Sequence, residues 1–352
     1  MGNTELADTL TDWYAGAARD LPWRRPDVRP WAVLVSEVML QQTPVARVLP
    51  VYDAWLERWP TPADLAADAP GEAVRMWGRL GYPRRALRLH AAAVAVAQRP
   101  GGELPRTVLE LLALPGVGDY TARAVAAFAY RQRVPVVDTN VRRVVARAVE
   151  GRADAPVTRR ALALVEQLLP VEAEAAATAS IALMELGALV CTARAPRCPT
   201  CPLRATCAWV AAGKPVLDSP VRRPQAWAGT DRQVRGRLLQ VLRESAAPVT
   251  AERLASVWDE PVQRARALDG LVGDGLVDPL PDGRFGLPGS EVRTSAPVSA
   301  GSPQSEALPL ARSTGGASGM STGLASARKV NFAASPSPST STTTMLPASS
   351  VP

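Results

Sequence analysis

Residues 114–122 read Leu114-Pro115-Gly116-Val117-Gly118-Asp119-Tyr120-Thr121-Ala122, a turn between two segments whose apolar residues recur at helical spacing. Glycines in such a turn let backbone N–H groups approach a phosphate at the positive end of the second helix. A plain tight turn between two helices is the alternative. The pattern L-P-G-V-G-x-Y-T-A favours a hairpin that clamps a DNA backbone, with Gly116, Val117 and Gly118 as its predicted contacts.

The first two-thirds of the chain is predicted to be helical. From about residue 4 to residue 210, short helical segments follow one another with polar or proline-glycine breaks between them. No stretch alternates convincingly with the period of two that strands show. The expected fold class of this core is therefore all-α.

A second unit is predicted beyond a proline-rich linker at residues 219–224. From about residue 227 to residue 288, the pattern indicates three helices, the second capped by Thr250, and then two short strands around Asp282-Gly283. Three helices followed by a hairpin predict a winged-helix-like module. Residues 290–352 are mostly Ser, Thr, Pro, Ala and Gly with few large apolar residues, so this tail is predicted to be disordered.

The charge of the chain favours a polyanionic partner. The 352 residues carry a formal net charge of +7 with a pI near 9.7, and counterion release drives such a protein onto nucleic acid. Its N-terminus lacks a basic start followed by an apolar run, and no apolar stretch reaches membrane-spanning length. We expect a cytoplasmic protein that binds DNA and no membrane.

The cysteines form one compact pattern, C-x6-C-x2-C-x5-C. They are Cys191, Cys198, Cys201 and Cys207. In a reducing compartment such a cluster indicates metal rather than disulfides. Zinc modules usually pair their ligands in two hooks separated by a longer span, whereas four thiolates on one loop match a cubane 4Fe-4S cluster. We expect this cluster in a structural role, with Arg194 and Arg197 on its loop meeting DNA phosphates.

Two carboxylates are candidates for chemistry. Glu37 lies in an otherwise apolar helical stretch, and a buried glutamate needs a reason. Asp138 follows apolar residues near an expected helix start, where an aspartate is often only an N-cap. Two carboxylates in different environments can supply a general acid and a stabiliser of positive charge, the arrangement used when a leaving group departs from a sugar.

Taken in order, these motifs resemble the adenine DNA glycosylases of the MutY type over about two-thirds of the chain. The matching segments are L-P-W-R at 21–24, S-E-V-M-L-Q-Q-T at 36–43, W-G-R-L-G-Y at 77–82, the hairpin at 114–122, V-D-T-N at 137–140 and the cysteine loop. Endonuclease III and its relatives share the helix-hairpin-helix, the aspartate and the cluster. The M-L-Q-Q-T box and Tyr120 make the resemblance specific to the MutY type.

The resemblance implies a two-lobed, all-α helix-hairpin-helix glycosylase fold. A six-helix barrel lobe at residues 25–133 would carry Glu37 and the hairpin. An iron–sulfur cluster lobe would form from residues 1–24 and 134–217 and carry Asp138. DNA is expected between the two lobes, bound to a monomer.

The resemblance also assigns roles to the residues of the catalytic site. Glu37 would protonate a ring nitrogen of adenine and then assist the attack of water, and Asp138 would stabilise the oxocarbenium-like sugar. Tyr120 and Asn140 would orient these carboxylates, and Arg24 would line the base pocket. Endonuclease III has a lysine at the position of Tyr120, and that lysine attacks the sugar. Because no lysine precedes Lys214 here, a lysine-dependent lyase is not expected.

The implied substrate is double-stranded DNA with adenine opposite 8-oxoguanine or guanine. Gln42, next to Gln41 in the same box, and Tyr82 resemble the wedge residues that enter the duplex as adenine is flipped out. A glycosylase for another base, such as thymine opposite guanine, is the alternative from the same superfamily. A non-catalytic iron–sulfur DNA-binding factor is the alternative from another class.

The chain departs from the family pattern at three places. Where the family commonly reads G-Y-Y-S-R-A, residues 81–86 read G-Y-P-R-R-A, with Pro83 and Arg84 in the third and fourth positions. Ile181 occupies a position often filled by Gln or Glu. The winged-helix-like unit replaces the MutT-like domain of well-known members and resembles the shorter C-terminal region of actinobacterial ones.

Overall fold

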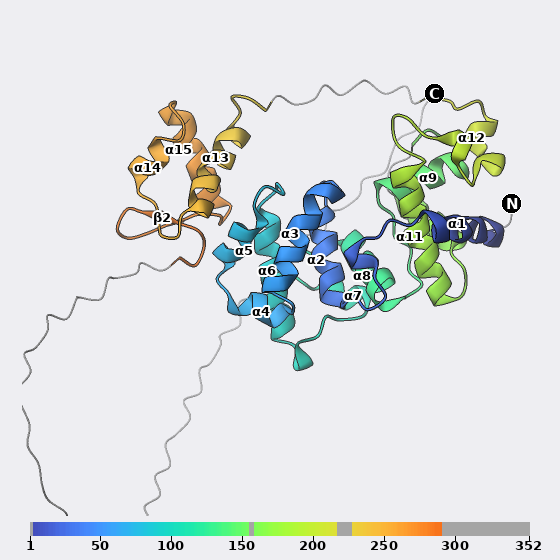
Figure 1. Ribbon diagram of the computed structural model, residues 1–352, viewed down its shortest axis with the longest axis horizontal. Coiled ribbons are helices and arrows are strands. Elements are labelled where there is room, and N and C mark those ends of the chain that lie inside the picture. The colour runs from blue at the N-terminus through green and yellow to red at the C-terminus, as the bar shows by residue number, and fades with distance from the viewer. Residues whose placement is uncertain (1–2, 155–157, 217–226, 291–352) are drawn as a thin grey trace, which may run out of the picture. The chain divides into compact units, whose positions relative to one another are not determined.

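The computed structural model describes residues 3–154, 158–216 and 227–290. By its contacts the chain divides into two units, Met1–Thr294 and Ser295–Pro352. The linker at residues 219–224 and all of the predicted tail except Ser290 lie outside the described residues. The described part is helical apart from one small hairpin, which confirms the all-α prediction (Figure 1). No described helix is long and apolar enough to cross a membrane.

The first helix group lies in the range predicted for the six-helix lobe and contains seven helices. They are α2 (Pro30–Leu40), α3 (Val45–Arg58), α4 (Pro62–Ala67), α5 (Pro70–Trp77), α6 (Arg84–Ala97), α7 (Val108–Leu112) and α8 (Asp119–Tyr130). The prolines of α4 and α5 stand at their starts, where a missing N–H costs nothing, so the chain forms two short helices there. Trp55 packs edge-to-face against Trp59 and Trp77 in the core, with ring centroids 4.7 and 5.7 Å apart.

Helix α2 is the central helix of this group. All residues from Trp31 to Met39 are buried, and α2 contacts α3, α6 and α8. A helix that is apolar on nearly every face has to be enclosed by its neighbours. Any polar residue on α2 is therefore held away from bulk water.

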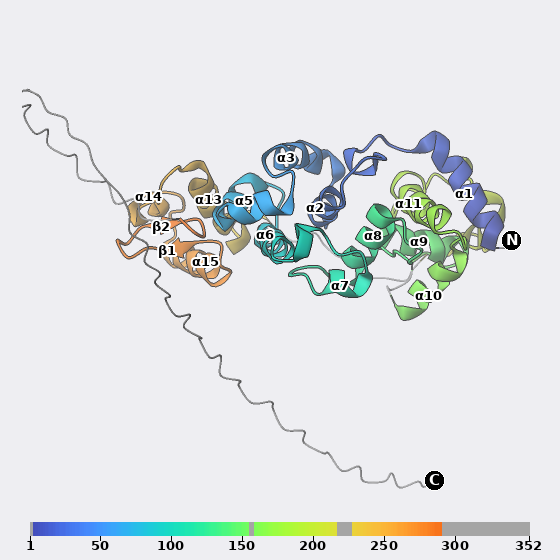
Figure 2. The same cartoon turned by 90° about the horizontal axis from the view of Figure 1, so that it is seen from below.

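The second helix group is formed by segments far apart in the sequence. They are α1 (Asn3–Ala17), α9 (Thr139–Ala148), α10 (Arg159–Leu168), α11 (Ala173–Leu189) and α12 (Ala208–Ala211). Helix α11 packs against α1 and α9, and Figure 2 shows α10 beside them. At the α9–α11 crossing a Cβ on Gly187 would lie 2.6 Å from Cβ of Asn140, so only glycine allows this approach.

The C-terminal module comprises α13 (Asp231–Glu244), α14 (Ala251–Ala255), α15 (Pro261–Gly273), β1 (Asp278–Pro279) and β2 (Phe285–Gly286). The strands are antiparallel, and the side chain of Thr250 caps α14 as predicted. Each strand spans only two residues because Pro279 and Pro281 cannot donate to a ladder. Val234, Leu238 and other residues of the module belong to the same hydrophobic core as the first helix group.

Candidate active site

A cavity of about 940 Å³ is lined by residues of both helix groups. Among its lining residues are nine of the predicted site residues: Arg24, Glu37, Gln41, Gln42, Gly116, Gly118, Tyr120, Asp138 and Asn140. The other predicted site residues do not line this cavity. They are Tyr82, Val117, Arg194, Arg197 and the four cysteines. The two candidate carboxylates, 101 positions apart in sequence, therefore face one cavity.

Glu37 is the buried acid of this cavity. Glu37 is only 6% exposed because α2 is enclosed on almost every side. This burial, with the nearby charge of Asp138, raises the pKa of Glu37 to about 7, although a hydrogen bond with Tyr120 and the charge of Arg24 lower it. Near neutral pH the side chain is thus available both as a proton donor and as a base.

Tyr120 is the second residue of α8, in the turn that follows the glycine hairpin. Desolvation of its hydroxyl, together with the charges of Glu37 and Asp138, raises the pKa of Tyr120 well above 10. The hydroxyl is therefore neutral and hydrogen-bonds with the Glu37 carboxyl. This hydrogen bond joins the first turn of α8 to the buried acid of α2.

Asp138 is also the N-cap of α9. Its Oδ1 accepts hydrogen bonds from the backbone N–H groups of Asn140 and Val141, at 2.9 and 2.7 Å. Its Oδ2 accepts one from Nδ2 of Asn140 at 2.8 Å. Burial raises the pKa of Asp138 above its usual range, while these three donors oppose the shift. The N-cap interpretation and the functional one are thus compatible: the cap holds the carboxylate in a fixed orientation at the cavity wall.

A chain of hydrogen bonds joins this carboxylate to the cysteine loop. Nη2 of Arg143 donates to Oδ1 of Asn140 at 2.8 Å and to the carbonyl of Gly187 at 2.7 Å. Its Nε donates to the carbonyl of Cys191 at 2.7 Å. Arg143 is buried. Sequence reasoning missed it because the carbonyls of Cys191 and Gly187 that it binds lie 48 and 44 positions away.

Sequence reasoning also missed Glu185, a second buried glutamate. It lies on α11, is fully buried, and forms salt bridges with Arg19 and Arg24 at 2.7 and 2.8 Å. Although desolvation acts against it, these two arginines lower the pKa of Glu185 to about 2. Its only signal in the sequence is the same as that of Glu37, an acid within an apolar helical stretch.

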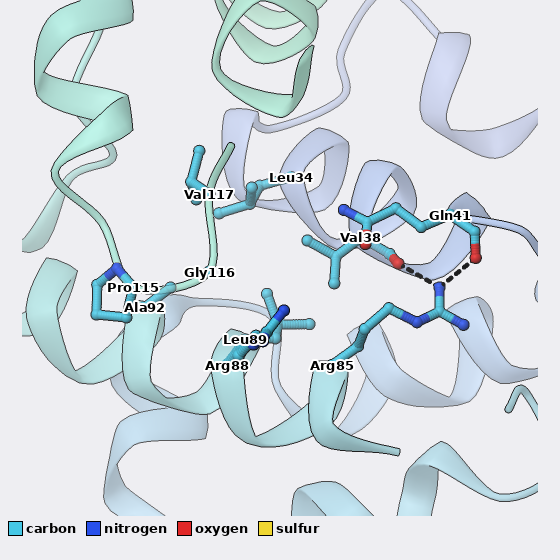
Figure 3. Close-up of a pocket in the computed structure, with 10 residues that line it drawn as sticks. All are labelled: Leu34, Val38, Gln41, Arg85, Arg88, Leu89, Ala92, Pro115, Gly116 and Val117. Atoms are coloured by element: carbon cyan, nitrogen blue, oxygen red, sulfur yellow. Dashed lines mark hydrogen bonds between the residues drawn. The ribbon is translucent and has the colours of Figure 1, made fainter. Parts of the chain in front are cut away.

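Arg85 organises the turn that follows α2, and it too was not predicted. Its Nη1 donates to the carbonyls of Val38 and Gln41, both at 2.7 Å (Figure 3). Its Nη2 donates to Oγ1 of Thr43 at 3.0 Å and to the carbonyl of Gly81 at 3.2 Å. One buried guanidinium thus caps α2 and ties the 41–43 turn to the corner at residues 81–83.

The glycine hairpin is the turn between α7 and α8. Gly116 has φ +77°, and a Cβ at this position would lie 2.6 Å from Cβ of Arg88, which lies beside it in Figure 3. Gly118 directly precedes α8, whose first N–H groups lack partners within the helix. A flexible glycine next to a helix start is the geometry that binds phosphates.

The four cysteines line one small cavity together with Arg147 and Trp209. Nη1 of Arg147 lies 3.5 Å from Sγ of Cys191, and its guanidinium stacks 4.5 Å from the Trp209 ring. In the described part of the chain, no three His, Cys, Asp or Glu side chains are close enough to hold a single metal ion. Four cysteines around one cavity are the ligand set that a 4Fe-4S cubane requires.

Comparisons with known proteins agree with this architecture. Residues 35–167 match the family model described as the HhH-GPD superfamily base excision DNA repair protein. A protein of Mycolicibacterium smegmatis named adenine DNA glycosylase is 59% identical over 82% of this chain and 98% of its own length. Two solved structures cover 60% of the chain: a thermostable thymine-DNA glycosylase, with TM-score 0.55 and 27% identity, and endonuclease III trapped on DNA, with TM-score 0.52 and 26% identity.

The curated relative matches nearly from end to end, including the C-terminal module, whereas the two solved structures cover less of the chain. The match to this relative spans 290 residues at 59% identity. The chain therefore belongs to the adenine DNA glycosylase family, within the helix-hairpin-helix superfamily of base-excision DNA repair enzymes.

Proposed function

We propose that this protein hydrolyses the N-glycosidic bond of adenine mispaired with 8-oxoguanine or guanine in double-stranded DNA and leaves an abasic site. The observation that carries the proposal is the pair Glu37 and Asp138 at one cavity, with Glu37 held at a pKa near 7. The name of the M. smegmatis relative supports adenine as the base. The preference for an oxidised guanine partner rests on the sequence resemblance.

In this mechanism Glu37 acts as the general acid. Its protonated form donates to a ring nitrogen of adenine, which makes the base a neutral leaving group. The resulting carboxylate then accepts a proton from the attacking water. A pKa near 7 suits both steps, because the proton is available and its loss costs little at neutral pH.

Asp138 serves the sugar rather than the base. As the bond to adenine breaks, positive charge develops on the sugar ring, and a carboxylate held by three hydrogen-bond donors stabilises it without first having to reorient. Tyr120 and Asn140 are positioning residues for the two acids. Buried Nη1 of Arg24 has no hydrogen-bond partner within the described chain and lines the cavity, so it is the donor we assign to the flipped adenine.

The chain is proposed to be monofunctional. A lyase of the lysine type needs an amine that forms a Schiff base with the sugar, and the first lysine of this chain is Lys214. The neutral hydroxyl of Tyr120 does not replace it. Strand cleavage at the product is therefore expected only after alkali.

The cysteine cavity is proposed to hold a 4Fe-4S cluster through Cys191, Cys198, Cys201 and Cys207. When bound, the cluster would supply a rigid cross-link between the four thiolates. Arg147 and Trp209 pack against its site, and exposed Arg194 and Arg197 on the same loop would meet DNA phosphates. The glycine hairpin would clamp the phosphates near the excised nucleotide. Gln42 and Tyr82 would act as wedges in the duplex.

Excision under single-turnover conditions tests the proposal. Duplexes would carry adenine opposite 8-oxoguanine, adenine opposite guanine, or thymine opposite guanine, and alkali would reveal abasic sites. Adenine loss from the first two supports the proposal. Thymine loss alone would identify the superfamily alternative, and an absence of excision with binding retained would identify the binding factor. Loss of excision in Glu37→Gln with retained duplex binding would assign the general acid.

Location and oligomeric state are proposed as well. A DNA-repair enzyme of this family is expected in the cytoplasm, bound to chromosomal DNA, and as a monomer. Residues of both helix groups of a single chain line the cavity, which supports the monomer. Analytical ultracentrifugation of the protein with and without duplex tests the monomer.

A further inference from the structure

The corner at residues 81–83 presents an aromatic ring outside the adenine cavity. Tyr82 is 50% exposed and adopts φ +46°, a backbone conformation unusual for a residue other than glycine. Arg85 stacks under its ring at 5.6 Å and binds the neighbouring Gly81 carbonyl. Since Arg85 also holds Gln41, the corner is fixed relative to the turn that lines the cavity. A ring that is both exposed and rigidly held is suited to contact a ligand.

The C-terminal module contacts α5, the helix that precedes this corner. The N–H of Gly71 donates to the carbonyl of Pro288 at 2.8 Å, and Nε of Arg243 donates to the carbonyl of Val74 at 2.9 Å. A Cβ on Gly71 would lie 2.6 Å from that Pro288 oxygen, so the contact requires glycine. Together with the shared hydrophobic core, these contacts fix the module on the helix that leads into the corner.

An ion pair joins the module to the residue after Pro83. Nη1 of Arg84 lies 3.2 Å from Oδ1 of Asp274, the C-cap of α15, and Arg235 of α13 binds the other oxygen of the same carboxylate. Arg84 is one of the two residues at which this corner departs from the common family pattern. In this chain the cation meets an acid of the module.

Arg232 of the module lies between two aromatic rings. Its guanidinium is 5.4 Å from the Tyr82 ring and 5.2 Å from the Trp227 ring, which is itself 53% exposed. Within the described residues Arg232 forms no ion pair, so its charge is not neutralised by a neighbouring acid. The result is a continuous exposed surface, here called the Tyr82–Arg232–Trp227 surface, of one cation and two rings.

We propose that the Tyr82–Arg232–Trp227 surface binds the DNA strand opposite the excised adenine. The inference rests on the proposed function, because the adenine strand has to reach Glu37 through the cavity. Tyr82 is tied to the cavity turn through Arg85 but is not among the residues that line the cavity. Since the cavity takes the flipped adenine, we assign this neighbouring surface to the other strand. Arg232 supplies the charge for a phosphate of that strand, and Trp227 supplies a face for a base unstacked beside the partner of adenine.

In this proposal the C-terminal module has a role in DNA binding. It holds Tyr82 in place through Arg232 and adds a phosphate contact and a stacking face beside it. Both added contacts lie on one strand, so the module would strengthen binding without touching the excised base. A purely structural module would instead affect stability and leave the pattern of phosphate contacts unchanged.

The test compares Arg232→Ala with Arg253→Ala in the full chain. Arg253 is an exposed arginine on α14 of the same module, so both variants lose one surface charge. The probe is a duplex with 2′-fluoroadenosine opposite 8-oxoguanine, in which the electron-withdrawing fluorine slows bond cleavage and allows equilibrium binding. For Arg232→Ala we expect roughly fivefold weaker binding and a salt slope smaller by about 1, which corresponds to one lost phosphate contact. The affinity and salt slope of Arg253→Ala should equal those of the wild type. The melting temperatures of both variants should also equal that of the wild type.

Single uncharged methylphosphonates then identify the strand. Placed along the strand opposite adenine, one of them should weaken binding of the wild type and leave Arg232→Ala unaffected, since the variant has already lost that contact. The inference would be overturned if the methylphosphonates had this effect in the adenine strand instead, or had no effect in either strand. Trp227→Ala should weaken binding roughly tenfold, and Trp227→Phe should restore most of it.

The two proposals fail in different ways. If the wild type excises no adenine, the proposed function is wrong. If the wild type excises adenine while Arg232→Ala and Trp227→Ala bind DNA as Arg253→Ala does, the function stands and the strand contact is wrong. Arg232→Lys separates charge from stacking, because lysine keeps the salt slope but lacks the planar group that packs between two rings.

Discussion

Glu37 and Glu185 are both buried glutamates on apolar helices, and their pKa values move in opposite directions. Burial raises the pKa of Glu37 to about 7, whereas Arg19 and Arg24 overcome desolvation and lower that of Glu185 to about 2. Arg24 approaches both acids, but its salt bridge at 2.8 Å is with Glu185. One acid is thus left able to exchange a proton near neutral pH, and the other is a fixed anion that holds Arg24 at the cavity.

The pH dependence of excision should report Glu37. If protonated Glu37 is the general acid, the single-turnover rate constant at saturating enzyme should fall about tenfold per pH unit above a pKa near 7. At low pH the rate should fall again as Asp138, whose pKa is also raised, becomes protonated. Rate constants measured between about pH 4 and pH 9 would show this bell-shaped pH profile. A rate that keeps rising through neutral pH would contradict the role of Glu37 as the acid.

Stability should also depend on the protonation of Glu37. Its folded-state pKa lies above the unfolded value of 4.5, so the folded protein binds more protons between these values and loses stability as pH rises through them. The shift corresponds to roughly 3 kcal/mol at pH 8. Glu37→Gln should therefore unfold at a higher denaturant concentration than the wild type at pH 8. The difference should shrink toward pH 4, which chemical denaturation at both pH values would measure.

Glu185→Gln should have the opposite effect on stability. It leaves Arg19 and Arg24 without their buried counter-ion, and breaking such a pair costs about 3 to 5 kcal/mol. The contribution of Glu185 is present above pH 4.5 and is lost as pH falls toward its folded pKa of about 2. The melting temperature at pH 7 should therefore fall strongly in Glu185→Gln and not in Glu37→Gln. Equal losses in the two variants would show that the two acids are not differentiated as described.

Sequence reasoning found those features whose signal is local. The hairpin at residues 114–122, the cap at Thr250 and the strands around Asp282-Gly283 depend on neighbours within a few positions, so their patterns predict them. The all-α class follows from periodicity in the same way. Glu37 and Asp138 were identified as candidates by an acid in an apolar stretch and by a resemblance. Their shared cavity became visible only in the structure.

Residues whose role depends on distant partners were not predicted. Glu185 meets Arg24 across 161 positions, and Arg85 meets the carbonyl of Gln41 across 44. An arginine gives no sign in sequence of whether it faces solvent, a carbonyl or a phosphate. Arg232 is the extreme case, because its neighbour Tyr82 is in a different helix group and no motif links the two.

Arg85→Ala should disturb both proposed wedge residues, Gln42 and Tyr82, at once. The guanidinium satisfies carbonyls at the end of α2 and at Gly81, and it fixes the turn that carries Gln42. Losing it leaves buried acceptors without donors, at about 1 to 3 kcal/mol each. We expect unfolding to be easier by roughly 3 kcal/mol or more and excision to slow, since the wedges are no longer held. Arg85→Lys should recover little, because one ammonium cannot reach carbonyls on both sides.

Arg88→Ala is the control variant for Arg85→Ala. Arg88 lies one helical turn further along α6 and lines the same small cavity in Figure 3. Arg88→Ala removes a cation of the same helix without removing a cap of α2. It should leave the melting temperature near that of the wild type. If Arg88→Ala destabilises the protein as much as Arg85→Ala does, the carbonyl contacts are not the cause.

Gly116→Ala should weaken DNA binding more than Gly118→Ala. Gly116 has φ +77°, and its new Cβ would lie 2.6 Å from Cβ of Arg88, so the hairpin has to shift. Gly118 has φ −96° and nothing within 4 Å of the position of its Cβ, so alanine fits there without strain. If the hairpin N–H groups clamp a phosphate, displacing them should weaken binding to any duplex, with or without a mispair, by roughly tenfold. Binding to matched and mispaired duplexes measured by fluorescence anisotropy would check this. Equal affinities for the two variants would mean that the hairpin is an ordinary turn between helices.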